Sequence, residues 1–571
     1  MWRNWLLLPR SFPRCLPRVS LWGEQTCGRM ERAVVRCVPC EPKLTISFTL
    51  DGSRRQLLRD QTEGVGKALQ RIASGVVKSQ SKSKKSKKGP ASGQPAEPAE
   101  PAVVLRYNGE RVASDATNLD AWRDGAVLHV GEMKYRVERN PPTLVAAELP
   151  ASLLAGFPVC PKLEIEFGEL RDCVYRWFKE GPDRSWTEAG SDRVYKPSNS
   201  DVGLKIKLKV TPGDGSREGV ARELVSAGAV EAGPGGCTFD NRHAYTCKVT
   251  DESTLRVVTY NILADVYAQT EVARTVLYPY CAPYALDLDY RQNLIKKELS
   301  GYNADIICLQ EVDKNVFADS LSPALDAFGM DGVFRIKDKQ HEGLATYFRR
   351  SKLKLLSQHD VVFSEALTSD PLHSELLQKV SSNASLLEKV LKRSTTLQVT
   401  VLQALTDPTK QLCVANTHLY WHPKGGHIRL IHMDMALRHL HRLISTERPG
   451  ASLLFFGDFN SSPSCGAFQL ADQGSISHTH PDWTRTEVEE HCPMDLVSPF
   501  QLQSASGEPA YTNYVGGFHG CLDYIFLEPR ALKVEQVIPM PSHQEVTTHQ
   551  ALPSVSHPSD HIALICDLKW K

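Results

Sequence analysis

The sequence predicts an α/β fold for the C-terminal half of the chain, preceded by a β-sandwich and a small α+β unit. Three observations support this order. From residue 255 onward, short apolar runs alternate with longer amphipathic segments, as in folds that alternate strands with helices. Residues 158–248 contain alternating strand patterns separated by Gly, Pro, Asp and Ser turns, which is typical of a β-sandwich. Residues 41–140 mix strand patterns with a short helical one.

The bulk composition limits the classes of function. The 571 residues are enough for about three or four domains. Lys and Arg total 67 against 66 Asp and Glu, so any attraction to nucleic acid must be local. Fifteen scattered cysteines, many in apolar runs, favour buried thiols in a reducing compartment over a disulfide framework. No run resembles a membrane span, and nothing indicates an obligate protein partner.

The N-terminus has the composition of a mitochondrial transit peptide. Residues 1–23 contain no Asp or Glu and place four arginines among tryptophans, leucines and a phenylalanine. A secretory signal would need a longer apolar run than Trp5–Leu8, which Pro9 ends. We therefore expect residues 1–40 to be a leader and the protein to reside in the mitochondrial matrix.

The unit at 41–140 contains a long interruption. A strand at 44–50 and a helix at 65–72 are followed by residues 79–102, where a Lys/Ser run and a Pro/Ala/Glu run show no apolar periodicity. We expect 79–102 to be a disordered insertion. Strand patterns return at 103–107 and 126–137. The lysines could contact RNA phosphates or could be an ordinary solvated charge run.

The predicted β-sandwich at 158–248 has strands at 163–167, 174–178 and 204–210. In the last of these, Lys205, Lys207 and Lys209 share one face. That face is either the solvated side of a half-covered sheet or a basic strip that leads a polyanionic substrate toward the next domain.

The region 253–571 places polar residues at the ends of its predicted strands. Leu453–Phe456 reads as a buried strand, after which Gly457 is expected to turn the chain so that Asp458 and Asn460 emerge together. Carboxylate and carboxamide groups suit a hard cation and a phosphate. Each residue alone could be a turn former, a surface residue or a core residue, but their series at successive strand ends favours a site. The series is Asn261, Glu311, His418, Asp458, Asn460, Asp523, Asp560 and His561.

These residues lie in motifs that resemble the endonuclease/exonuclease/phosphatase family. T-Y-N, L-Q-E, N-T-H, G-D-F-N, L-D-Y and S-D-H occur in the family's order over about residues 253–571. The resemblance implies a two-sheet α/β sandwich as the catalytic domain and Mg²⁺-dependent cleavage of phosphate esters. It makes Glu311 the principal Mg²⁺ ligand, assisted by Asn261 through the water shell of the metal. Asp458, Asn460 and Asp560 would lie at the metal or its water.

The resemblance also assigns catalytic roles. Asp458 would activate the attacking water, while Asn460 and His418 would hold the phosphoryl oxygens. Asp523 would bond His561 and favour its imidazolium form, which supports the developing charge. Hydrolysis would be in line, with no covalent intermediate.

Four further segments resemble the poly(A) deadenylase branch of the family: 277–281, 290–292, 302–312 and 511–514. The resemblance implies that adenosine-rich RNA, namely 2′,5′-oligoadenylate and the poly(A) tails of mitochondrial RNA, is hydrolysed to 5′-AMP. Asn513, Phe518 and Pro423 would bind the substrate, the last two by enclosing the terminal adenine. One departure is His422, where the deadenylases usually carry Asp. The alternatives are a catalytically inactive RNA-binding adaptor, or a phosphoinositide phosphatase or other phosphoesterase on the same fold.

Overall fold

The computed structural model describes residues 30–85, 103–337 and 340–571. It divides into two compact units, Met1–Thr143 and Leu144–Lys571. Within the described ranges, no helix is both long and apolar enough to cross a membrane. The cysteines in these ranges are unpaired and most of them are buried, consistent with the interpretation of the sequence.

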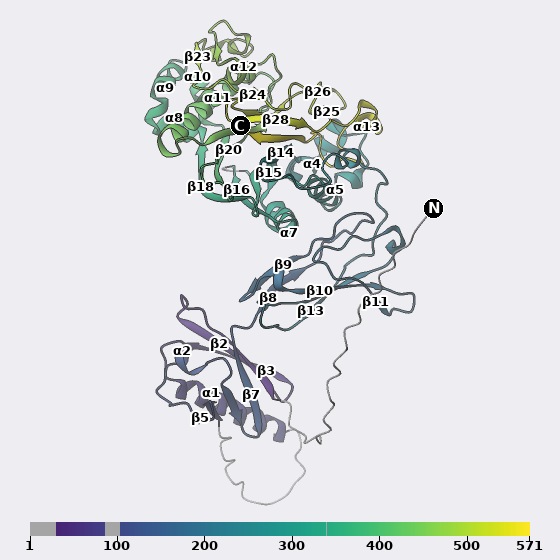
Figure 1. The fold of residues 1–571 in the computed structure, drawn as a ribbon, viewed down its shortest axis with the longest axis vertical. Helices are drawn as coiled ribbons and strands as arrows, with labels where there is room; N and C mark the ends of the chain where they lie inside the picture. Colours follow the sequence, from purple (N-terminus) through teal and green to yellow (C-terminus); the bar gives the residue numbers. More distant parts are fainter. Residues whose placement is uncertain (1–29, 86–102, 338–339) are drawn as a thin grey trace, which may run out of the picture. The chain divides into compact units, whose positions relative to one another are not determined.

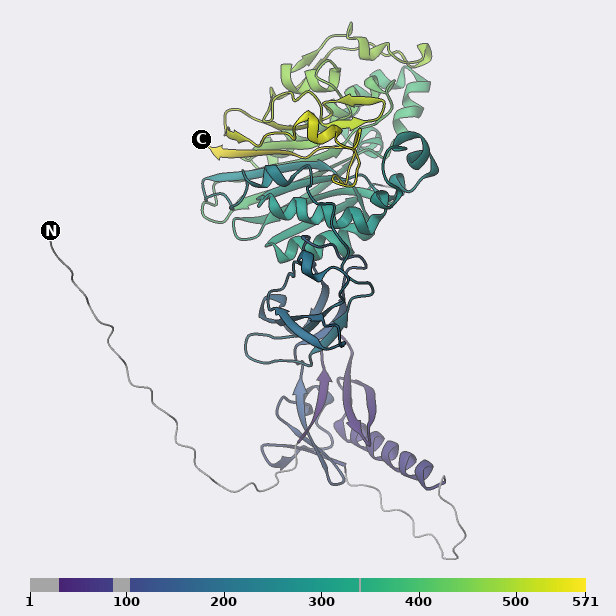
Figure 2. The same ribbon diagram turned by 90° about the vertical axis from the view of Figure 1, so that its right-hand side faces the viewer.

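The first unit is a seven-stranded sheet with a long helix, α1 (Val65–Lys85), beside it (Figure 2). Alternate strand residues such as Ala33, Ile46 and Tyr135 are fully buried and form a core with the apolar side of α1. A short helix, α2 (Asn118–Ala121), adds Trp122 to this core. In spatial order the strands are β3 (Ser53–Asp60), β2 (Lys43–Leu50), β1 (Glu31–Arg36), β7 (Met133–Arg139), β6 (Val127–Val130), β4 (Val103–Tyr107) and β5 (Glu110–Arg111).

Two predicted boundaries in this unit are wrong. The leader was expected to extend to residue 40, but β1 already lies at Glu31–Arg36, because Ala33 and Val35 alternate into the core. Residues 1–29, which hold the arginine-rich stretch, lie outside the described residues. The insertion was expected from residue 79, but α1 continues to Lys85. Adding turns to an existing helix is inexpensive, and lysine favours helix even without an apolar face; residues 86–102 are not described.

The second unit begins with the predicted β-sandwich. Its larger sheet has the order β11 (Trp186–Gly190), β10 (Val174–Glu180), β12 (Ile206–Thr211) and β13 (Arg222–Val225). A smaller sheet pairs β8 (Thr143–Glu148) with β9 (Lys162–Glu166). Both sheets contribute to one core that includes Leu144, Leu163 and Trp177. The sandwich therefore starts before the predicted residue 158, because β8 supplies one of its apolar faces.

The basic face of β12 is partly engaged. The ammonium of Lys207 lies over the rings of Phe178 and Trp186 and is 3.4 Å from Glu223. Such contacts favour a structural role for this lysine over an open strip of positive charge.

The rest of the second unit confirms the predicted α/β fold as two stacked six-stranded sheets. The first sheet has the order β16 (Met330–Ile336), β17 (Glu342–Arg349), β15 (Ile306–Asp313), β14 (Thr254–Asn261), β29 (Leu564–Trp570) and β28 (Leu532–Val537). The second has β18 (Leu353–Val362), β19 (Thr396–Ala404), β20 (Gln411–His418), β21 (Ser452–Asp458), β27 (Asp523–Leu527) and β24 (Gln503–Ser504). Val257, Cys308, Val414 and Phe456 belong to the core between them.

Helices cover the outer face of each sheet (Figure 1). The first sheet packs against α5 (Leu288–Gly301) and α7 (Ser322–Ala327). The second packs against α8 (Phe363–Ser369), α9 (Ser374–Ser381), α10 (Ala384–Leu391), α11 (Gly426–Arg442) and α12 (Gly466–Gln473). The strands are apolar on both faces because they are covered on both sides, as expected for buried sheets.

Two parallel strand pairs determine where polar side chains gather. β14 runs parallel to β15, and β20 runs parallel to β21, whereas the other pairs within these two sheets are antiparallel. Parallel neighbours end at the same edge, so Asn261 and Glu311 lie together, as do His418 and Asp458. Asp523 begins the antiparallel β27 directly opposite Asp458.

Candidate active site

A cavity of about 580 Å³ opens where the polar ends of both sheets meet. Eight of the residues predicted from the sequence line it: Glu311, His418, Asp458, Asn460, Asn513, Phe518, Asp560 and His561. Asn261 and Asp523 do not line the cavity themselves. Each is hydrogen-bonded to a residue that does, Asn261 to Glu311 and Asp523 to His561. Pro423 is exposed and does not line the cavity.

Glu311 enters the cavity from a β-bulge rather than from a strand end. The sequence predicts that its strand stops here, but β15 continues to Asp313 and its register with β17 shifts between Leu309 and Val312. Glu311 has φ = 54°, a left-handed conformation that is costly for glutamate. A bulge redirects a side chain out of the sheet alternation, here into the cavity.

The Glu311 carboxylate is held by two donors. Its Oε1 accepts from Asn261 Nδ2 at 2.9 Å, and its Oε2 accepts from the backbone N–H of Ala264 at 3.0 Å. Burial, followed by the negative charges of Asp560 and Glu342, raises the pKa of Glu311 to about 7. The carboxylate therefore lies in a negatively charged environment that lacks a full counter-charge.

Asn261 links Glu311 to Asp458. Its Nδ2 also donates to Asp458 Oδ2 at 3.0 Å, and its Oδ1 accepts from the N–H of Leu263 at 3.0 Å. The Ser559 hydroxyl donates to the Asn261 carbonyl at 2.7 Å. In this arrangement the Asn261 amide holds two carboxylates in place, and its oxygen already has a donor.

Asp458 ends β21, and Gly457 before it has a different role from the one predicted. Gly457 is a strand residue, and a Cβ there would lie 2.3 Å from the Thr417 carbonyl oxygen, so glycine permits the close approach of β20. The turn is at Asn460, with φ = 47°. The Asn460 N–H donates to Asp458 Oδ1 at 2.9 Å. Burial and the charge of Asp523 raise the pKa of Asp458 to about 6, against the opposing effect of His561.

Asp523 and His561 form a buried pair. Asp523 Oδ2 and His561 Nδ1 are 2.8 Å apart, and His561 Nε2 is 3.6 Å from Asp458 Oδ2. Burial alone would lower the pKa of His561, but the carboxylates of Asp523 and Asp458 raise it well above its ordinary value. The imidazolium form predicted from the sequence is thus favoured, and its Nε2 faces Asp458.

His418 has the opposite protonation state. Its Nδ1 is 3.1 Å from the ammonium of Lys337, and its Nε2 is 3.6 Å from Asp458 Oδ2. Burial and the charge of Lys337 lower the pKa of His418 well below its ordinary value. His418 is therefore neutral, and Lys337, which is also 2.7 Å from Glu342, brings a buried positive charge to the cavity.

Asp560 is held by two hydrogen-bond donors. Its Oδ2 accepts from the Tyr278 hydroxyl at 3.1 Å and from Asn513 Nδ2 at 3.3 Å. Because the charge of Asp560 also raises the pKa of Glu311, the two carboxylates are electrostatic neighbours.

The wall of the cavity carries exposed aromatic rings. Phe518 lies in β26 (Phe518–Gly520), which forms a hairpin with β25 (Asn513–Val515), and is 51% exposed. Trp421 is also largely exposed, and the Arg393 guanidinium lies 4.6 Å from the ring centre of Tyr420. Phe518 is therefore a surface residue of the cavity and not part of the core.

Five further residues that were not predicted from the sequence line the cavity: Lys337, Lys392, Arg393, Tyr420 and Trp421. Lys392 and Arg393 follow a surface helix, and Lys337 follows an edge strand, so no local pattern distinguishes them from solvated charges. The only signal was the aromatic stretch Tyr420–Trp421 after His418.

The donor chemistry fits a hard divalent cation. Asp458, Asp523 and His561 offer ligand atoms within 4.8 Å of one another. However, a protonated His561 bonded to Asp523 is a poor ligand. Glu311 and Asp560 provide carboxylates whose mutual repulsion a cation would relieve, and oxygen donors are what Mg²⁺ and Ca²⁺ prefer.

Comparison with known proteins gives the following matches. Residues 258–561 match the endonuclease/exonuclease/phosphatase family, and residues 141–231 match a domain described as "2′,5′-phosphodiesterase 12-like, N-terminal domain". The chain is 59% identical over 589 residues to the Bos taurus protein "2′,5′-phosphodiesterase 12", covering 97% of this chain and 96% of the relative.

More distant matches cover the C-terminal part. The Schizosaccharomyces pombe "CCR4-Not complex 3′-5′-exoribonuclease subunit Ccr4" is 28% identical over 349 residues, covering 55% of this chain and 49% of the relative. The crystal structure of ANGEL2, described as a 2′,3′-cyclic phosphatase, in complex with adenosine-2′,3′-vanadate, is 24% identical with a TM-score of 0.46, covering 56% of this chain and 96% of that one.

Proposed function

Because the chain belongs to the endonuclease/exonuclease/phosphatase family, we propose that it is a Mg²⁺-dependent phosphodiesterase and 3′-exoribonuclease. Its substrates are adenosine-rich oligonucleotides, namely 2′,5′-oligoadenylate and the poly(A) tails of mitochondrial RNA, and its product is 5′-AMP. The names of the bovine and fission yeast relatives support these two activities. The observation that carries the proposal is the position of His561 and Asp458, 3.6 Å apart, in the cavity that Glu311 also lines.

The protonation states of the site suit the hydrolysis of a phosphate diester. Above a pH of about 6, Asp458 is ionised and can accept a proton from a water molecule as the water oxygen attacks phosphorus. His561, as an imidazolium held by Asp523, stabilises the negative charge that develops on the phosphoryl oxygens. The neutral His418 and the Asn460 amide offer further hydrogen bonds to these oxygens.

The bond that breaks joins phosphorus to the 2′ or 3′ oxygen of the preceding nucleotide, and this oxygen takes a proton from water as it leaves, so that it ends as a hydroxyl. The terminal nucleotide then leaves with its 5′-phosphate, which accounts for 5′-AMP as the product. Glu311 and Asp560 would hold Mg²⁺, which neutralises phosphate charge when bound. Asn261 keeps the Glu311 and Asp458 carboxylates oriented toward one cavity.

Adenine preference requires groups other than the metal site, because phosphates carry no base identity. Phe518 presents an exposed ring at the cavity, which suits stacking on a terminal base. Pro423, expected to form the other side of this base pocket, lies outside the cavity lining. Tyr420 and Trp421 are the aromatic groups that line the wall instead.

We also propose that the protein resides in the mitochondrial matrix. The support is the composition of residues 1–23, in which arginines and apolar residues occur without acids.

The proposal is tested by incubating the purified chain with 2′,5′-linked and 3′,5′-linked triadenylate in Mg²⁺ and, separately, in EDTA. We expect 5′-AMP from both substrates in Mg²⁺ and none in EDTA. The His561→Asn variant should lose activity, whereas a matched control, His519→Asn on the exposed face of β26, should retain it. Hydrolysis that persists in EDTA, or that survives His561→Asn, would contradict the proposal.

A further inference from the structure

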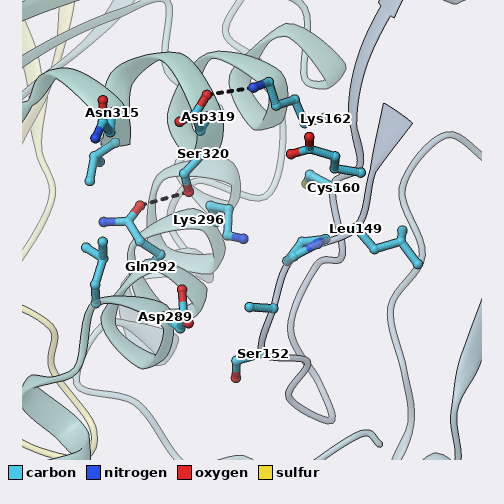
Figure 3. Close-up of a pocket in the computed structure, with 15 residues that line it drawn as sticks. Leu149, Ser152, Cys160, Lys162, Asp289, Gln292, Lys296, Asn315, Asp319 and Ser320 are labelled. Carbon is cyan, nitrogen blue, oxygen red and sulfur yellow. Dashed lines mark hydrogen bonds and ion pairs between the residues drawn. The ribbon is translucent and has the colours of Figure 1, made fainter. Parts of the chain in front are cut away.

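A second cavity, of about 220 Å³, lies away from the catalytic set (Figure 3). One side is the segment that connects β8 to β9 in the β-sandwich, and the other is α5 with the helical segments α6 (Lys314–Val316) and η5 (Phe317–Leu321). Its polar lining includes Glu148, Ser152, Asp289, Gln292, Lys296 and Asp319. None of these residues belongs to the site proposed for hydrolysis.

Lys296 is the feature that makes this cavity unusual. The residue is only 5% exposed, and its amine points toward the hollow in Figure 3. Among the residues that the structure describes, it has no hydrogen-bond or ion-pair partner. Burial lowers the pKa of Lys296, because an ammonium removed from water without a counter-ion is costly. Lysines are almost never buried unless they are paired.

The nearby carboxylates do not supply the missing counter-charge. Asp319 is already paired with Lys162, with Oδ1 and Nζ 2.8 Å apart. Glu148 and Asp289 line the cavity but are exposed to solvent. Asp289 lies seven residues before Lys296 on α5, about 10 Å along the helix axis. It raises the pKa of Lys296, but less than Cys160 does. The Cys160 thiol also lines the cavity, yet burial raises its own pKa, so it stays neutral and supplies no counter-charge.

The remaining walls combine hydrogen-bonding groups with an apolar surface. Ser152 Oγ accepts from Asn293 Nδ2 at 3.3 Å, which leaves its own proton available to a ligand. Gln292 Oε1 accepts from the Ser320 hydroxyl at 2.9 Å. Leu149, Pro150, Ala151, Leu288 and Val316 provide apolar contacts. The volume is below the roughly 300–1,000 Å³ of pockets for drug-sized ligands, which favours a small molecule.

We propose that this cavity binds a small oxyanion, a phosphate or a carboxylate, whose charge pairs with Lys296. The ligand would complete the ion pair that the protein leaves open and would join the β-sandwich segment to α5. This inference does not depend on the proposed hydrolytic activity.

The test is calorimetric titration of the full chain in EDTA, with sodium phosphate in one arm and sodium succinate in the other. We expect wild type to bind one of these anions through a site that Lys296→Met weakens by about tenfold or more. Lys354→Met, which removes an exposed lysine from β18, is the matched control and should bind like wild type. The arm that responds identifies the anion as a phosphate or a carboxylate.

Phosphate bound in the catalytic cavity does not obscure the result, because that cavity is unchanged in Lys296→Met. Removing an unpaired buried ammonium should leave the thermal unfolding midpoint of the anion-free protein equal or higher. If the methionine variant does not fold, Lys296→Gln takes its place. Equal binding by wild type and the Lys296 variant, or no binding of either anion, would overturn the proposal even if oligoadenylate hydrolysis is found.

Discussion

Replacing Phe518 with alanine tests how adenine is recognised. The ring is half exposed at the cavity wall, so its removal should cost the fold little compared with removal of a core phenylalanine. Stacking of a base on an aromatic ring contributes about 1–3 kcal/mol. Since 1.4 kcal/mol is about a factor of ten, kcat/KM on oligoadenylate should fall by roughly ten- to a hundredfold in Phe518→Ala.

The assay compares two substrates. Hydrolysis of triadenylate should fall in Phe518→Ala, while hydrolysis of a small phosphate diester without a purine should barely change, because Asp458 and His561 stay in place. His519→Ala is a suitable control, since this residue neighbours Phe518 in β26 and its ring stacks on Tyr514 at 5.4 Å rather than lining the cavity.

Equal losses on the two substrates in Phe518→Ala would refute this reasoning. Such a result would mean that the ring supports the hairpin of β25 and β26 and that adenine is recognised elsewhere. An equal loss in His519→Ala would point to the same conclusion, because it would trace the effect to the hairpin and not to the ring.

Three further perturbations have defined outcomes. Glu311→Ala should abolish most activity without lowering the thermal midpoint, and near wild-type rates at raised Mg²⁺ would instead show a minor ligand. Burial raises the pKa of Glu298 to about 7, so its contribution to stability is fully present below about pH 4.5 and is lost as the pH rises through 7. Glu298→Gln should remove about 3 kcal/mol of this pH-dependent loss of unfolding free energy. Denaturant titrations at pH 4.5 and 8 measure the loss, and a variant that loses as much unfolding free energy as wild type between these pH values would contradict the prediction. Deleting residues 1–23 should prevent mitochondrial import and spare catalysis; detection of the shortened protein in the matrix by fractionation would reject the transit-peptide hypothesis.

The sequence alone could predict which strand ends carry polar groups, because buried strands are marked by apolar runs. That these groups converge was expected of an α/β fold, but the pairings that bring them together, β14 parallel to β15 and β20 parallel to β21, are seen only in the structure. This topology brings His418 and Asp458 together, whereas Glu311 reaches the same cavity through its bulge.

Other features depend on contacts between distant segments. The bulge at Glu311 arises from the register of β15 against β17, which no local pattern specifies. Gly457 is a glycine because of the Thr417 carbonyl on the neighbouring strand, not because of a local turn. Lys337 is identified only by its contacts with Glu342 and His418.

The boundaries failed for a related reason. β1 lies within the predicted leader because its burial depends on pairing with β2 and β7. The sandwich begins at β8 because that strand pairs with β9 across an intervening segment. Composition alone was the basis for the predicted leader and insertion, but strand pairing decides where the fold begins.

The most direct test of the account is the rate of triadenylate hydrolysis by Asp458→Asn in saturating Mg²⁺ at pH 8. The substitution preserves the shape of a fully buried side chain and removes the carboxylate that would accept the proton of the attacking water. We expect the rate to fall at least about a hundredfold below wild type, while the variant unfolds at a similar temperature. A rate close to wild type would contradict the assignment of this cavity as the site of phosphodiester hydrolysis.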